Sequence, residues 1–162
     1  MKYFLLNRIT KEKLDSLNED NLMFITNPGR MGDENGSTFI MKEDNTLIAY
    51  RASGWMYGSE DCDVGLDDME NAFPHWMNAW KNSSNEDYDE KFKYVYMGFG
   101  NGLSVNREIY DVFKKYLDEE VSERAKKENA DTNEHSLKYV SWEKAALKTA
   151  NELGYEIEAI ER

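Results

Sequence analysis

The densest cluster of reactive side chains in this chain is an acidic run over residues 60–70, where six of eleven positions are carboxylates. Asp61, Asp63 and Asp67 are spaced as in a calcium-binding loop, because Ca²⁺ takes several oxygen ligands from one turn. The register does not fit, since the glycine comes one position early and Ala72 stands where a bidentate acid is required. The run therefore predicts no calcium site.

Two other interpretations of the run stay open. Asp67, Asp68 and Glu70 fall in the first turn of an expected helix, where negative charge complements the helix dipole. Alternatively, the run is an acidic contact surface with Trp55, Tyr57 and Trp76 at its border, since buried aromatics often anchor interfaces. A second acidic segment follows about twenty residues later. The residues expected to bind a partner are Trp55, Tyr57, Glu60, Asp61, Asp63, Asp67, Asp68, Glu70, Glu86, Asp87, Asp89 and Glu90.

A glycine-rich segment over residues 98–104 is the second candidate site. We expect it to join a strand to a helix, where free backbone amides and the helix dipole can hold an anion. It is neither a dinucleotide fingerprint, because Leu103 replaces the third glycine, nor a phosphate loop with Gly-Lys-Ser/Thr. It also fits a tight connection with positive φ. The anion-binding alternative comprises Gly98, Gly100, Gly102, Ser104 and Arg107.

Groups for catalysis or metal binding are scarce, with two histidines and one cysteine in the chain. His75 stands beside Trp76 at a helix start that Pro74 marks, so we interpret it as structural. His135 lies in a polar stretch and is expected to face solvent. The sequence therefore predicts no zinc site, no cofactor and no catalytic residue, and it indicates binding rather than catalysis.

Charge limits the partners, because 32 acidic residues against 20 basic ones give a formal net charge of -12. Such a protein is repelled by phosphate backbones and anionic lipids, so we expect neither direct nucleic-acid binding nor membrane binding. The acidity is explained either by solubility alone or by electrostatic complementarity to a basic protein partner.

Length and composition predict one domain over residues 1–162 that can bury its own core, since 40% of the residues are hydrophobic and 13% aromatic. The lone Cys62 suits a reducing compartment, and no signal peptide or membrane span is visible. We therefore expect a cytoplasmic protein, with its oligomeric state left open.

Periodicity and turn signals predict a mixed α+β fold without regular βαβ alternation. We expect a largely antiparallel sheet with three to four helices packed mainly on one face. In the strand over 91–99, Phe92, Tyr94 and Tyr96 are expected to share one face, leaving the other wet. Expected strands are 2–9, 22–26, 38–42, 46–51, 91–99 and 155–160, and expected helices are 10–19, 66–80 with a break or kink at Pro74, 105–127, and 141–153.

Taken together, these features predict an acidic interaction domain of bacterial or phage type. It would neutralise a basic partner such as a nuclease toxin or a nucleic-acid-binding defence effector, as an immunity or anti-defence inhibitor whose carboxylates act as a nucleic-acid mimic. The alternative is a small-molecule or anion-binding domain, or an enzyme, that uses the turn at residues 98–102. Whether the two acidic segments share one face is not fixed by the sequence.

Overall fold

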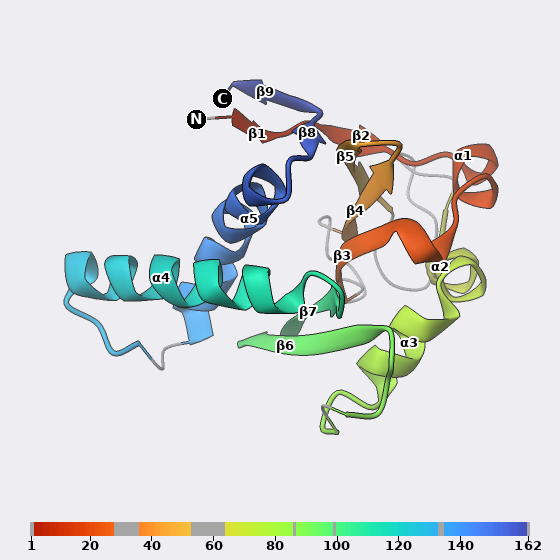
Figure 1. Ribbon diagram of the computed structural model, residues 1–162. Coiled ribbons are helices and arrows are strands. Elements are labelled where there is room, and N and C mark those ends of the chain that lie inside the picture. The colour runs from red at the N-terminus through yellow and green to blue at the C-terminus, as the bar shows by residue number, and fades with distance from the viewer. Residues whose placement is uncertain are drawn as a thin grey trace.

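The computed structural model describes residues 2–27, 36–52, 64–85, 87–98, 100–132 and 135–161. The fold is α+β, as predicted, with five α-helices in these ranges and a mostly antiparallel seven-stranded sheet (Figure 1). The elements are β1 (Lys2–Phe4), β2 (Leu6–Arg8), α1 (Lys11–Asp15), the 3-10 helix η1 (Glu19–Asn21), β3 (Leu22–Thr26), β4 (Thr38–Glu43), β5 (Thr46–Arg51), α2 (Leu66–Ala72), α3 (Pro74–Lys81), β6 (Phe92–Gly98), β7 (Asn101–Asn106), α4 (Tyr110–Glu128), α5 (His135–Glu152), β8 (Glu156–Ile157) and β9 (Ala159–Glu161).

The sheet runs in the order β2-β5-β4-β3-β7-β6, and β8 also pairs with β5. The predicted hairpin of β4 and β5 is confirmed, with a two-residue turn in which Asp44 has a φ of 53°. At its other edge β5 pairs in parallel with both β2 and β8. The two ends of the described chain then meet as the antiparallel pair β1 and β9 (Figure 1).

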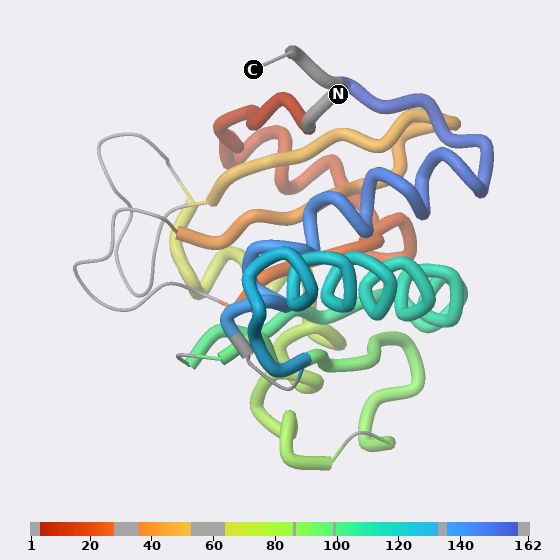
Figure 2. The backbone as a smooth tube through the Cα atoms, turned by 90° about the vertical axis from the view of Figure 1, so that its left-hand side faces the viewer, coloured from red at the N-terminus to blue at the C-terminus, as the bar shows by residue number. Residues whose placement is uncertain are grey.

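Helices cover both faces of the sheet. The two long helices α4 and α5 lie on one face, in front of the strands in Figure 2, and the short α1, α2 and α3 lie on the other. Strand β4 shows the division, because Ile40 joins the core under α4 and α5 whereas Phe39 and Met41 join the second core. The prediction of helices mainly on one face thus holds for the long helices, while the opposite face has its own core.

Local signals explain several boundaries. A break or a kink was predicted at Pro74. Pro74 is the first residue of α3, so the chain breaks there into two helices. The side chain of Thr10 caps α1 by accepting a hydrogen bond from the Lys13 amide at 3.2 Å. Gly154, at a φ of 76°, follows the end of α5, as expected of a C-terminal glycine.

β6 ends at Gly98 and pairs as a β-hairpin with β7, which begins at Asn101, so the predicted strand-to-helix turn is wrong. Gly98 and Gly100 take positive φ values of 84° and 74°, which glycine adopts without strain. Gly102 already lies in β7, where an added Cβ would overlap the phenol ring of Tyr94 on β6. The helix expected from residue 105 therefore begins only at Tyr110.

This hairpin also changes the faces of β6. Val95 and Met97 are buried in the core under α4 and α5, whereas Tyr96 is 46% exposed. Phe92 lies on the same face as Tyr96 and belongs to the second core. The predicted wet face is wrong because α4 and α5 cover the side of β6 that carries Val95.

Helices α4 and α5 are held together by a buried carboxylate. Glu120 is 5% exposed, and it forms ion pairs across to α5 with Lys144 at 3.0 Å and with Lys148. Arg124, one helical turn after Glu120, pairs with Glu128 at 3.5 Å. Helix α5 begins at His135, ahead of the start expected at Ser141, which is buried.

The Glu120 ion pairs predict a pH-dependent contribution to stability. Burial raises the pKa of Glu120, but the two lysines lower it further, so the net pKa lies below the ordinary value. A carboxylate with a depressed folded pKa stabilises above its unfolded pKa, and this stability is lost as the pH falls through the folded pKa. We expect Glu120→Gln to lower the free energy of unfolding by about 1–2 kcal/mol near neutral pH, since both lysines are partly exposed.

Denaturant melts of both proteins across pH test this. The difference should shrink as the pH falls through the lowered pKa of Glu120 and the carboxylate of the parent protein becomes protonated. The exposed Glu123→Gln on the same helix is the control. An equal loss in both variants at neutral pH would contradict a role for the buried pair.

Candidate functional site

The second predicted acidic segment forms the turn that leads into β6. Its Asp89 is only 6% exposed, and its Oδ1 accepts hydrogen bonds from the Lys91 amide at 2.8 Å and the Phe92 amide at 3.0 Å. His75 Nδ1 lies 3.5 Å from the other oxygen of the same carboxylate. Asp89 therefore organises the turn, and its prediction as a surface contact is wrong.

Arg107 fastens this turn to the end of β7. Its Nε donates to the carbonyl oxygen of Asp89 at 2.6 Å, and its amide donates to the carbonyl of Lys91 at 2.9 Å. The turn is thus held from inside by a carboxylate and from β7 by a guanidinium. Its outward side chains, among them the exposed Asp87 and Glu90, are presented on a fixed backbone.

Three carboxylates from separate segments surround one shallow hollow at this edge of the sheet. Asp20 comes from η1, Glu90 from the turn, and Glu108 from the connection between β7 and α4. The hollow has a volume of about 340 Å³, and Lys91, Asn106 and Arg107 complete its lining. We call this site, formed by Asp20, Glu90, Lys91, Asn106, Arg107 and Glu108, the acidic depression.

Two cations, Lys91 and Arg107, line the acidic depression, and each already has a partner within the chain. Lys91 Nζ lies 2.5 Å from Asp20 and 3.9 Å from Glu19, and the Asp20 hydrogen bond raises the pKa of Lys91 despite some burial. Glu90 and Glu108 are exposed and form no ion pair with any residue that the structure describes. The depression therefore offers unneutralised negative charge on its rim.

Glu19 connects the depression to α3. Its Oε1 accepts hydrogen bonds from the amides of His75 at 2.8 Å and Trp76 at 3.2 Å, at the start of a helix whose N-cap residue Phe73 offers no side-chain bond. Burial raises the pKa of Glu19, although these amides and the nearby His75 and Lys91 act in the opposite direction. The cap is long-range in sequence, which is why local patterns do not predict it.

The first acidic segment is only partly described, and its described carboxylates serve the fold. Asp68 accepts from Lys11 at 2.8 Å and from the Gly65 amide at 3.0 Å, which hold its pKa below the ordinary value. Glu70 pairs with Lys81 at 2.6 Å. Asp67 is exposed, so it is the described acid of this segment that remains most available to a partner.

Some of the predicted contact residues are buried or lie outside the description. Trp76 is 0% exposed in the core beneath α3, so its prediction as a surface anchor is wrong. The turn before β6 meets the start of α3, directly after the end of α2, because Asp89 Oδ2 lies 3.5 Å from His75 Nδ1. Trp55, Tyr57, Glu60, Asp61, Asp63 and Glu86 lie outside the described residues.

The residues of the anion-binding alternative are not brought together. The amide of Gly102 donates to Asn27 Oδ1 at 2.5 Å, and that of Gly100 to the Tyr96 hydroxyl at 3.4 Å, so neither is directed at solvent alone. Ser104 is buried within β7, and Arg107 lies beyond the far end of that strand. No helix starts at the glycine turn, so the dipole that the prediction required is missing there.

Sequence reasoning missed four members of the acidic depression, the carboxylates Asp20 and Glu108 together with Lys91 and Asn106. Both carboxylates are distant in sequence from Glu90, and only the pairing of β3 with β7 and of β7 with β6 brings them near it. No pattern along the chain identifies them. Within the described ranges, no three His, Cys, Asp or Glu side chains are placed to hold a metal ion together, and no helix there is long and apolar enough to span a bilayer.

Comparison of the chain with protein families, with curated protein sequences and with solved structures finds no match. Everything proposed about its activity below therefore depends on the geometry and charge of its own residues.

The Glu19 cap yields a prediction that separates hydrogen bonding from charge. We expect Glu19→Ala to lower the free energy of unfolding by about 1–2 kcal/mol, as loss of a helix cap does. Glu19→Gln should lose less than half as much, because an amide oxygen can accept from the same two backbone amides. Chemical denaturation of both variants measures this, and an equal loss in the two would show that charge, not capping, is what matters.

Proposed function

We propose that this protein is an acidic interaction domain that binds and neutralises a basic protein partner. The partner class that fits is a nuclease toxin or a nucleic-acid-binding defence effector, whose lysines and arginines attract carboxylates at long range as they attract phosphates. The proposal retains the function expected from the sequence and moves its contact surface to the acidic depression, with Asp67 and Asp87 as further exposed acids.

The main support for this proposal is that two carboxylates at the acidic depression form no ion pair with described residues. Glu90 and Glu108 are exposed and have no ion pair among the described residues, whereas the neighbouring Lys91 is engaged by Asp20. A basic side chain of a partner would meet these carboxylates without competition from a lysine of the chain itself. The net charge of -12 adds a long-range field of the same sign.

A rigid backbone beneath the acids supports the same proposal. Asp89 and Arg107 fix the turn that carries Glu90, and Asn106 Oδ1 accepts from the amide of Glu108 at 3.0 Å. Carboxylates on a fixed frame lose less conformational entropy on binding than those on a free loop. Electrostatic complementarity of this kind mainly accelerates association and selects the partner.

Affinity capture from a lysate tests the proposed function. We expect the protein to retain a basic partner at about 50 mM salt and to lose most of it at about 300 mM, because screening shortens the Debye length. A Glu90→Lys, Glu108→Lys double variant should lose capture at both salt concentrations, since charge reversal opposes the partner.

The matched control is Glu12→Lys, Glu156→Lys, which reverses two exposed acids on α1 and β8 and makes the same change in net charge. It should retain capture at low salt. Equal loss in both double variants would place the effect in net charge alone and contradict the acidic depression as the contact surface. Absence of any basic partner at low salt would overturn the proposed function itself.

A further inference from the structure

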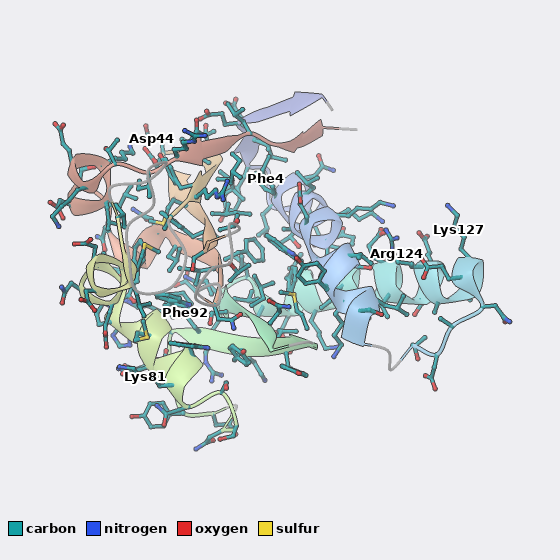
Figure 3. All side chains as sticks on the ribbon, turned by 180° about the vertical axis from the view of Figure 1, so that it is seen from behind. Phe4, Asp44, Lys81, Phe92, Arg124 and Lys127 are labelled. Atoms are coloured by element: carbon teal, nitrogen blue, oxygen red, sulfur yellow. The ribbon has the colours of Figure 1, made fainter. Side chains whose placement is uncertain are left out.

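A second hollow lies at the opposite edge of the sheet from the acidic depression, between the strands β1, β2, β4 and β5 and the first half of α5. Its volume is about 390 Å³. This lies toward the small end of the range of about 300–1,000 Å³ for small-molecule sites. Phe4, Leu6 and Ile40 form the apolar strand side, and Tyr139, Trp142 and Glu143 form the helix side. In Figure 3, Phe4 lies between the sheet and α5.

The helix side is built by one face of α5. Positions 139, 142 and 143 are three and four residues apart, so their side chains lie together toward the sheet. Tyr139 remains 49% exposed and Leu6 41% exposed, although both line the hollow. Large apolar side chains that stay exposed around a concave surface are typical of binding sites.

Glu143 carries a negative charge that pairs with no residue that the structure describes. Its Oε1 is buried and accepts no hydrogen bond from any described residue, and no ion pair joins the side chain to them. Burying a carboxylate oxygen without a partner is costly, whereas a cation or donor placed beside it recovers that cost. Arg51, on the strand side, has an interaction partner of its own.

We infer that this pocket binds a small organic amine with an aromatic or aliphatic body. The ammonium group pairs with Glu143, and the body packs on Phe4, Leu6 and Ile40. The rings of Trp142 and Tyr139 supply the cation–π surface by which proteins recognise organic cations. The net charge of -12 of the whole chain also favours a positively charged ligand. The site is independent of the acidic depression, because the two lie at opposite edges of the sheet.

The test is an NMR titration of the isotopically labelled full chain with phenethylamine, benzylamine and cyclohexylmethylamine. Each amine is compared with the alcohol of the same carbon skeleton, and 3-phenylpropionate serves as the anionic analogue. We expect at least one amine to shift the amide signals of residues 139–143, with a Kd about tenfold lower than that of its alcohol, as a charged hydrogen bond provides.

Variants locate the effect. Glu143→Gln should abolish the preference for the amine over its alcohol, and it should not lower the unfolding midpoint, because the half-buried carboxylate that it replaces has one buried oxygen without a described partner. Tyr139→Ala, at an exposed helix position, should weaken all of the amines. Glu119→Gln, an exposed acid of α4, is the control and should bind as the parent protein does.

Three results would overturn the inference. The first is that none of the three amines shifts residues 139–143. The second is that each amine binds no more tightly than its alcohol. The third is that 3-phenylpropionate binds more tightly than the amines, which would assign the pocket to anions held by Arg51. None of these results tests the acidic depression, so failure of this inference would leave the proposed function unaffected.

Discussion

The structure depends on one constraint, which is that the sheet is buried on both faces. Strands β3, β4 and β5 supply side chains to a core under α4 and α5 and to a second core under α1, α2 and α3. Leu22, Phe24 and Ile25 of β3 are each 0% exposed, as is expected of a strand covered on both sides. A register slip in these strands would expose one core or the other, so both cores fix the same pairing.

This constraint confines charged and ligand-facing groups to the edges of the sheet. Where a carboxylate enters the interior it is used for structure: Glu120 joins α4 to α5, and Asp89 holds the turn before β6. Three exposed acids, Asp20, Glu90 and Glu108, meet where the sheet ends, at the acidic depression beside β6 and β7. The opposite edge, where β5 meets β2 and β8, carries the pocket with Glu143. A protein with both sheet faces occupied thus offers two separate edges for recognition.

Much of the fold could be predicted because it is encoded locally. The β4–β5 hairpin has alternating apolar residues around a short turn. Pro74 marks the start of α3, and Gly154 follows the end of α5. The second strand of the β6–β7 hairpin was missed because Gly102 is a poor strand former that is present only to make room for Tyr94.

The acidic depression could not be predicted, since Asp20 and Glu108 become neighbours of Glu90 only through strand pairing. Of the carboxylates predicted to bind a partner, Asp68 and Asp89 proved to stabilise the fold, a role that depends on hydrogen bonds invisible in a sequence.

The most direct test of the central claim is to map where a basic chain contacts the surface. An NMR titration with a short polylysine peptide at about 20 mM salt, where surface charges are little screened, would report contact residue by residue. The account predicts that shifts concentrate at Asp20, Asp87, Glu90 and residues 106–111, and that they fade at about 300 mM salt as screening increases. Shifts spread evenly over the acidic surface, or centred on the exposed acids of α4, would contradict it.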